Sequence, residues 1–298
     1  MPHQGSWVKD MKKYALALVL ILVIGLVAGC LGGGDETTSP SPESSPSQTE
    51  IQTTSTPSTT APMETESTPT ETPREYTRED LLRGLGGIRQ LTYTANVSIL
   101  MNVTIEQGET LQKDTLNLSV VERGYLDFES WNAWINMTTT SHPDGASTNT
   151  SRVIVSNVTY VQTPLGVIKG DESLPDPVWE YNLLTLARRY LRREPERVER
   201  GDVTAFVYPL TGKDATTLAQ LYLAISPDTE ITVEWAYLVL QFKEDELIGG
   251  AISYRVTSRT EINDPSLGNM VITQEALVEE AISVESVNEK VEVKAPTT

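Results

Sequence analysis

The stretch that decides the fold is Leu91–Ile105, LTYTANVSILMNVTI, in which polar and apolar side chains alternate over the whole length. Successive side chains of a β-strand point to opposite faces of its sheet, so one face of this strand is apolar and the other polar. Parallel sheets are covered on both faces, whereas antiparallel sheets commonly keep one face in water. The stretch therefore predicts a long strand in an antiparallel sheet with one wet face.

More strands are expected after this one. A turn at Gln107-Gly108 leads into a second strand around Leu116–Val120, and the third is expected to run from Tyr125 to Met137. The remaining strands are expected at Val153–Val155, Val158–Gln162, Leu165–Lys169, Val203–Leu210, Ile231–Lys243, Leu247–Glu261 and Met270–Val287. The last stretch also has apolar spacing suited to a helix, but its β-branched ends favour a strand.

Three helices are expected around these strands. One begins after Thr77, and a second begins at Asp176-Pro177, where Asp is a favourable N-cap and Pro suits the first helical position. The arginines between Arg188 and Arg193 lie near the end of the second helix, where the helix dipole favours positive charge; we prefer this explanation to a patch that binds lipid headgroups. Asp214 is expected to cap a short third helix. The order of elements predicts an α+β fold with an antiparallel sheet.

Composition argues against several classes of function. The 298 residues carry 23 Lys and Arg against 41 Asp and Glu, a net charge of −18, whereas a nucleic-acid surface needs clustered cations. Cys30 is the single cysteine, which leaves no intramolecular disulfide and no cysteine-rich metal site. His3 and His142 are the two histidines, which argues against a histidine-based zinc site or triad. With no acid/base pair for catalysis in sight, we expect a protein without enzyme activity, metal or cofactor.

The N-terminus has the pattern of a secretory signal. Two lysines precede the apolar run Tyr14–Ala28, and Met11 is an alternative start. A run of about 15 residues is short for a membrane span, which needs roughly 20. The sequence Val27-Ala28-Gly29-Cys30 resembles the lipobox of lipoprotein precursors, in which cleavage precedes the cysteine and a lipid is attached to its sulfur. We expect a signal peptide at 1–30 and lipidation of Cys30; the alternative is an uncleaved N-terminal anchor.

A stalk is expected at 31–75. Thr, Ser and Pro make up most of the residues from Asp35 to Arg74, and Ile51 and Met63 are the only large apolar side chains there. Such a segment cannot bury enough apolar surface to offset the entropy of ordering it, so it is expected to stay disordered. Tracts of this composition are typical of mucin-like stalks, with or without O-linked sugars. The folded domain is then expected at 76–298.

Six sequons for N-glycosylation fall within about sixty residues of the domain. Their acceptors are Asn96, Asn102, Asn117, Asn136, Asn149 and Asn157. Because a glycan must sit in water, the sequons predict that the polar face of the first strand is the outer one. The alternative, in which Asn and Thr simply populate a solvated strand, predicts the same wet side.

The order of elements resembles the LolA-like and LppX/LprG-like half-barrel lipoproteins. Four stretches carry the resemblance: LTYTANVSILMNVTI, SNVTYVQTPLGVIKG, PVWEYNLLTLARRYL and VESVNEKVEVKAP. The resemblance implies a strongly curved antiparallel sheet, a half-barrel, that wraps a few α-helices around an apolar cavity for a lipid or acyl chain. The stalk and the density of sequons also resemble cell-surface lipoproteins of archaea.

These observations lead to a functional hypothesis. We expect an extracytoplasmic lipoprotein, anchored to the outer face of the cytoplasmic membrane, that carries or senses a lipid or other hydrophobic ligand. The expected lining of its cavity is Val97, Ile99, Met101, Leu118, Trp131, Ile135, Trp179, Leu183 and Leu186. The alternatives are a structural or adhesive surface glycoprotein with a filled core, and a protein-binding partner of an envelope complex.

Overall fold

A computed structural model describes residues 76–172, 175–223, 229–264 and 268–296. The described strands are β1 Gln90–Gln107, β2 Thr110–Asp127, β3 Asn132–His142, β4 Ser147–Val155, β5 Val158–Thr163, β6 Gly166–Lys169, β7 Arg197–Glu199, β8 Thr204–Pro209, β9 Glu230–Lys243, β10 Glu246–Asp264 and β11 Gly268–Val287. The described helices are α2 Arg78–Gly86, the 3-10 helix η1 Pro177–Trp179, α3 Leu183–Tyr190 and α4 Gly212–Leu223.

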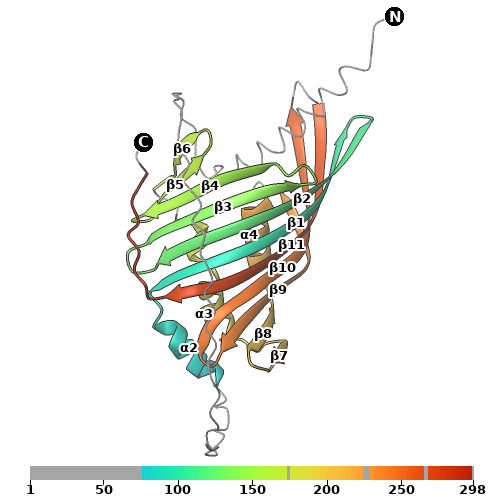
Figure 1. Cartoon of the computed structure of the whole chain (residues 1–298). Helices are drawn as coiled ribbons and strands as arrows, with labels where there is room; N and C mark the ends of the chain where they lie inside the picture. The colour runs from blue at the N-terminus through green and yellow to red at the C-terminus, as the bar shows by residue number, and fades with distance from the viewer. Residues whose placement is uncertain (1–75, 173–174, 224–228, 265–267, 297–298) are drawn as a thin grey trace, which may run out of the picture. The chain divides into compact units, whose positions relative to one another are not determined.

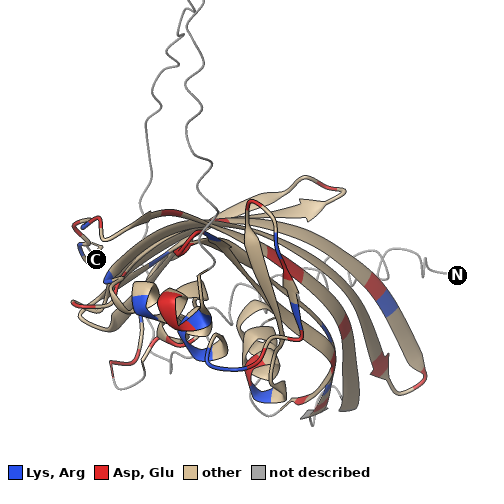
Figure 2. Cartoon of the chain, turned by 90° about the horizontal axis from the view of Figure 1, so that it is seen from below, with Lys and Arg blue, Asp and Glu red and all other residues tan. Residues whose placement is uncertain are grey.

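All described strands belong to one antiparallel sheet, in the order β6-β5-β4-β3-β2-β1-β11-β10-β9-β8-β7. The first strand pairs with the last, so two meanders meet at β1 and β11 in the middle (Figure 1). The end strands β6 and β7 do not pair with each other, and the sheet stays open. It curves into an arch whose concave side holds the helices (Figure 2). The predicted curved antiparallel sheet around a few helices is confirmed at this level.

The alternation predicted for the first strand sorts its side chains between the two faces of the sheet. Val97 and Met101 are buried on the concave face, whereas Asn96 and Ser98 are exposed on the outer face. The strands predicted from Val203 onward are confirmed within a few residues, and the ambiguous stretch near the C-terminus is strand β11. The short strand β7 was not expected, because its sequence reads as a solvated loop.

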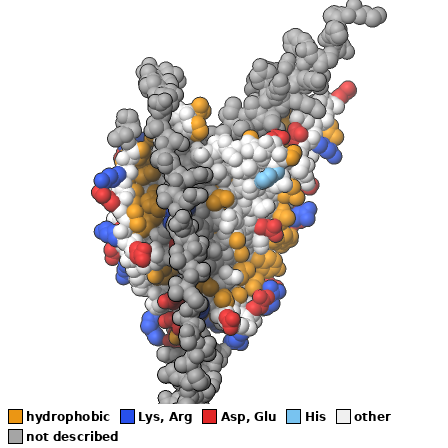
Figure 3. Space-filling model, in the orientation of Figure 1, with side chains coloured by type: hydrophobic (Ala, Val, Ile, Leu, Met, Phe, Trp, Pro, Cys, Tyr) orange, Lys and Arg blue, Asp and Glu red, His pale blue; other side chains and the backbone are white. Residues whose placement is uncertain are grey.

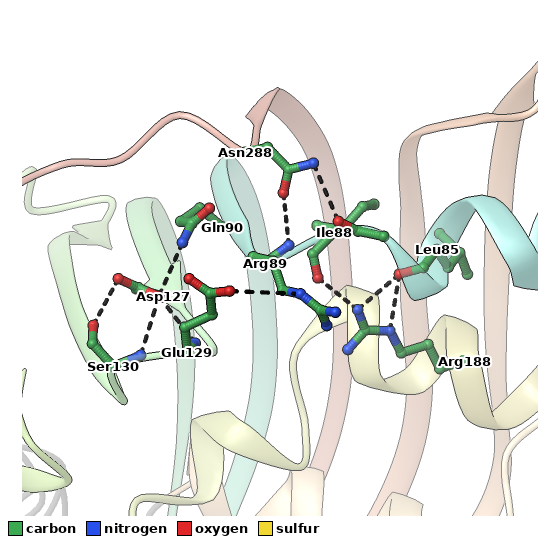
Figure 4. A network of polar contacts seen from close by, with 10 residues as sticks. Leu85, Ile88, Arg89, Gln90, Asp127, Glu129, Ser130, Arg188 and Asn288 are labelled. Atoms are coloured by element: carbon green, nitrogen blue, oxygen red, sulfur yellow. Dashed lines mark hydrogen bonds and ion pairs between the residues drawn. The ribbon is translucent and has the colours of Figure 1, made fainter.

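The predicted third strand was wrong. Instead of one strand from Tyr125 to Met137, β2 ends at Asp127 and β3 begins at Asn132. The Asp127 carboxylate makes the turn, because it accepts hydrogen bonds from the backbone N–H groups of Glu129 and Ser130 and from the Ser130 hydroxyl (Figure 4). Apolar residues on both sides of this turn hid it in the sequence.

The predicted helix from Asp176 is broken in two. The Asn182 side chain donates to the carbonyls of Val178 and Trp179, which end η1, and accepts from the N–H of Thr185, which begins α3. One side-chain amide thus caps both pieces.

The cap predicted for the third helix was also wrong. The Thr211 hydroxyl accepts from the Asp214 N–H at 3.2 Å, so Thr211 caps α4. Asp214 is instead buried, where it accepts from Arg189 at 2.9 Å and from the Tyr190 hydroxyl at 2.6 Å. By contrast, the helix predicted after Thr77 is confirmed as α2, and Thr77 caps it in a capping box with Asp80.

Polar contacts hold the helices against one end of the sheet. Arg188 of α3 donates to the carbonyls of Leu85 and Ile88 at the end of α2, at 2.7 and 2.8 Å (Figure 4). Asn288, just after β11, accepts from the N–H of Arg89 at 2.7 Å. These contacts satisfy carbonyls that a helix end leaves open, and they tie the start of β1 to the end of β11.

Candidate functional site

The concave face of the sheet is the candidate site, because it collects the apolar side chains. Eight of the nine residues predicted to line a cavity are buried there or on the helices that face it: Val97, Ile99, Met101, Leu118, Ile135, Trp179, Leu183 and Leu186. All of them except Ile135 belong to one continuous apolar cluster. Whether any of them contacts a ligand stays a prediction.

Trp131 lies elsewhere than expected. It sits in the turn between β2 and β3, with a positive φ of 55°, and 48% of it is exposed. Its ring packs edge-on against Trp179 with centroids 5.3 Å apart, and Phe128 packs against the same ring at 5.9 Å. Trp131 therefore covers one end of the apolar cluster from the solvent side.

The helices α3 and α4 pack against the concave face. Leu183 of α3 lies so close to Gly250 of β10 that a Cβ there would meet its Cδ1 at 2.7 Å. Tyr254 of β10 donates to the Leu218 carbonyl of α4 at 3.3 Å. Tyr222, in the last turn of α4, reaches Glu280 of β11. Figure 1 shows α2 and α3 at one end of the strands and α4 behind the middle of the sheet.

The middle of the concave face is apolar. It carries Ile99 and Met101 of β1, Val256 of β10 and Val278 of β11, and each is at most 4% exposed. Val278 lies opposite Tyr254, whose hydroxyl donates to α4, so α4 lies close to this part of the face. We call these four residues the central face.

Two buried glutamates interrupt the apolar surface of the concave face. Glu122 of β2 is 7% exposed and Glu280 of β11 is 6% exposed, with β1 between them. Sequence reasoning missed both. The available signal was the period of two: Glu122 falls in phase with Leu118 and Val120, and Glu280 in phase with Val278.

Each glutamate is held by a tyrosine hydroxyl. Tyr93 donates to Glu122 at 2.5 Å and Tyr222 donates to Glu280 at 2.9 Å. The Tyr93 ring crosses Gly124 to reach its partner, and a Cβ at Gly124 would come within 2.4 Å of that ring. Glycine at 124 is thus required by the close approach of the tyrosine.

Burial raises the pKa of both carboxyls. Loss of water around Glu280, together with the charge of Glu122, raises the pKa of Glu280 to about 8, against a lowering by its hydrogen bond from Tyr222. Burial also raises the pKa of Glu122, while Tyr93 and the positive charge of Arg152 lower it. The interior therefore holds at least one carboxyl that is largely protonated near neutral pH.

The positive charge of Arg152 lowers the pKa of Glu122, but Arg152 forms its ion pair with another acid. Its guanidinium pairs with Asp176 at 3.1 Å, and Asp176 also accepts from the Thr159 hydroxyl at 3.0 Å. Asp176 in addition caps η1 by accepting from the N–H of Val178. The group ties β4 and β5 to η1, so we assign it a structural role. Acids outnumber cations in this part of the interior.

A hollow of about 450 Å³ lies against the middle of β2, β1, β11 and β10. It is lined by residues 96–98, 119–121, 251–253 and 279–281. The inward-facing members, such as Val97 and Ile252, are almost fully buried, whereas Asn96, Ser98 and Ala281 are exposed. A space of this size would expose the side chains that line it, so the hollow lies on the outer face and is not a cavity inside the arch.

The remaining predicted sites divide between the outer face and the chain outside the described residues. Cys30, the signal peptide and the stalk lie outside the described residues. Five sequon acceptors are exposed on the strands: Asn96, Asn102, Asn117, Asn136 and Asn149. Asn157 is half-buried in the turn between β4 and β5. Among the described residues, no helix is long and apolar enough to cross a membrane.

Comparison with known proteins adds little. No family model matches the chain, and no curated protein matches it. One similar structure is a DUF1329 family protein from Desulfovibrio piger, with 7% identity over 70% of this chain and 91% of that chain and a TM-score of 0.22. Another is a β-barrel-like protein of the domain of unknown function DUF1849 from Brucella abortus, with 9% identity over 67% of this chain and 100% of that chain and a TM-score of 0.23. TM-scores this low carry no argument, and the resemblance to half-barrel lipoproteins stays a prediction.

Proposed function

We propose that this protein binds a lipid or another hydrophobic ligand on the concave face of its open sheet, as a carrier or sensor without catalysis. The observation that carries the proposal is the concave face, a continuous apolar surface that includes the central face. Ligand sites are typically concave and lined mainly by apolar side chains. An acyl or isoprenoid chain laid along these strands would fit such a lining.

The binding energy would come from removing apolar surface from water. Each buried methylene of a ligand contributes about 0.8 kcal/mol, so affinity scales with chain length rather than with any reactive group. The interior beside Glu122 and Glu280 disfavours an anionic headgroup, because burying it costs desolvation and Arg152, the cation near these carboxyls, already pairs with Asp176. We therefore infer that the ligand enters tail first and keeps an anionic headgroup outside.

The proposal includes a membrane anchor at Cys30, through the lipid that the lipobox predicts. A single acyl chain holds a membrane only marginally, so a two-chain anchor is expected. Forty stalk residues would span about 120 Å as polyproline II, or about 35 Å as a flexible coil. In both regimes the domain stands off the membrane and can meet lipids or other surfaces.

A second candidate is a structural or adhesive surface protein whose core is filled. The low exposure of Ile99, Met101, Val256 and Val278 favours it, because a face that is already covered has no room for a ligand. The two candidates make opposite predictions for a titration of the chain with an alkyl probe.

The test uses neighbouring residues on opposite faces of β1. An alkyl probe whose fluorescence rises in apolar surroundings is titrated into the wild-type chain, Met101→Trp and Leu100→Trp. Met101 is 2% exposed on the concave face and Leu100 is 44% exposed on the outer face. We expect the wild type and Leu100→Trp to bind the probe alike, and Met101→Trp to bind it at least about tenfold more weakly, which corresponds to about 1.4 kcal/mol.

Circular dichroism and thermal unfolding of each variant separate lost binding from lost folding. A folded wild-type chain that takes up no alkyl probe would rule out the proposal and favour the filled core. Equal loss of binding in Leu100→Trp would move the binding site to the outer face.

A further inference from the structure

The outer face of β1 to β4 is polar but carries no charge over a wide area. Cross-strand pairing places the outward side chains of residues 94–102, 115–121, 136–142 and 147–151 on one surface, whose edge between Thr94 and Asn136 is marked by Arg123 in its ion pair with Glu285. None of these outward side chains is Asp, Glu, Lys or Arg, although 21% of the chain is charged. Figure 3 shows a broad area of uncharged polar side chains and backbone, with charged groups toward its margins. We call this surface the neutral face.

The other half of the outer surface is charged in the usual way. Arg255 of β10 pairs with Glu234 of β9 at 3.2 Å, and Arg259 pairs with Glu261 at 2.5 Å. Glu279 of β11 is exposed beside the neutral face. The acidity of the chain therefore does not extend across the sheet, and the neutral face needs an explanation of its own.

Five sequon acceptors lie on the neutral face and none lies on the described outer surface of β9 to β11. Asn96 and Asn102 belong to β1, Asn117 to β2, Asn136 to β3 and Asn149 to β4. The register sets Asn136 diagonal to Asn149, and Asn102 diagonal to Asn117. Diagonal neighbours across two strands are about 7–8 Å apart, which spreads the acceptors over the surface.

Hydroxyls on adjacent strands orient three of these amides. Thr115 donates to the Asn102 Oδ1 at 2.9 Å. Ser151 donates to the Asn136 Oδ1 at 2.7 Å, and Thr138 donates to the Asn149 Oδ1 at 2.8 Å. In each case the carbonyl oxygen is held against the sheet, so the amide nitrogen, which is the atom that carries a glycan, is left to point away from that contact.

Asn157 differs from these acceptors in its burial, hydrogen bonding and backbone conformation. Its Oδ1 is buried without a hydrogen-bond partner, its φ is 67°, and its backbone N–H donates to the Trp131 carbonyl at 3.0 Å. A glycan on its nitrogen would pull the amide that carries this oxygen out of the turn.

We propose that the neutral face is a glycan-bearing face, with N-linked oligosaccharides on Asn96, Asn102, Asn117, Asn136 and Asn149 and none on Asn157. In the modification the Asn Nδ2 bonds to the anomeric carbon of a lipid-linked oligosaccharide phosphate. The bond from that carbon to the phosphate oxygen breaks, the lipid phosphate leaves, and Nδ2 loses one proton, with no change of oxidation state. A separate glycosyltransferase supplies this reaction.

Sugars account for the lack of charge, because they replace charged side chains as the water-binding layer of this face. The hollow on the outer face lies beside Asn96 and Ser98, which gives the first sugars at Asn96 a recess to occupy. This inference does not depend on the ligand proposed for the concave face.

Site-resolved mass spectrometry of tryptic peptides tests the proposal on the full chain purified from the organism that encodes it. Cleavage after Lys113 and Arg123 isolates Asn117, and cleavage after Arg152 and Lys169 isolates Asn157. We expect oligosaccharide mass on the first peptide and the bare mass on the second. A bare Asn117 peptide or a glycosylated Asn157 peptide would overturn the proposal.

Matched variants give the second readout in the same organism. Asn117→Gln should lower the mass of the intact protein by one oligosaccharide, whereas Asn157→Gln should leave the sugar mass unchanged. An unchanged sugar mass in Asn117→Gln, or a loss in Asn157→Gln, would contradict the assignment.

Discussion

The two faces of the sheet use the same strands for opposite purposes. On β1, Ile99 and Met101 face a buried apolar interior, while Leu100 and Asn102 between and beside them face water. The concave face gathers the groups that are costly to expose, together with two carboxyls that are costly to bury. The outer face between β1 and β4 gathers neutral polar groups. A strand period of two is enough to keep these surfaces apart, and it makes neighbouring residues natural controls for one another.

The largest difference between the faces is expected for removal of apolar volume. Leu186 of α3 is fully buried against the concave face, so Leu186→Ala should lower the free energy of unfolding by about 2–5 kcal/mol through lost burial and a cavity. Leu100→Ala on the outer face should cost less than about 1 kcal/mol. Urea unfolding of both variants measures the difference. Similar losses of unfolding free energy in Leu186→Ala and Leu100→Ala would mean that the concave face is not more deeply buried than the outer face.

A smaller effect is expected from the buried acid, and it depends on pH. Burial raises the pKa of Glu280 from 4.5 to about 8, so the folded chain keeps a proton that the unfolded chain loses. The free energy of unfolding should therefore fall as pH rises from about 4.5 to about 8. Glu280→Gln removes this term and should be more stable than the wild type at pH 8 by roughly 2–4 kcal/mol.

Denaturant unfolding of the wild type and Glu280→Gln from pH 5 to 8.5 measures how the free energy of unfolding of each protein changes with pH. Parallel curves for the two proteins would show that Glu280 titrates near its ordinary pKa, which would place it in water rather than in the interior.

The smallest effect is expected where the Tyr93 ring crosses the sheet. Gly124→Ala should destabilise the chain by about 1–3 kcal/mol, because the new Cβ displaces the ring and disturbs its hydrogen bond to Glu122. Gly86→Ala is the control, since a Cβ there meets nothing within 4 Å. If thermal unfolding finds the two alanine variants equally stable, the ring does not hold the glutamate as described.

Periodicity predicted most of the fold, and local polar contacts decided the rest. The alternation from Leu91 to Ile105 gave the strand, its faces and the antiparallel sheet. It could not show that Asp127 ends β2 or that Asn182 divides a helix, because each break depends on one side chain folding back on the backbone. Strand order was also beyond the pattern, since the pairing of β1 with β11 joins residues 163 to 196 positions apart.

The candidate site was predicted in its apolar part and missed in its polar part. Residues such as Ile99 and Leu186 follow from their spacing, so their burial could be expected. Glu122 and Glu280 read as ordinary surface acids until the register shows that they share the inward phase of their strands. Tyr222, which holds Glu280, comes from a different part of the chain, and no local pattern links the two.

The central claim is that the concave face binds a hydrophobic ligand, and native mass spectrometry tests it most directly. The chain is purified without detergent from a lipid-containing host and weighed before and after organic extraction. The account predicts extra mass that the extraction removes and that proves to be lipid, which also names the ligand class. A clean mass of the chain alone, together with a compact domain that takes up no added lipid, would contradict the claim and favour a filled core.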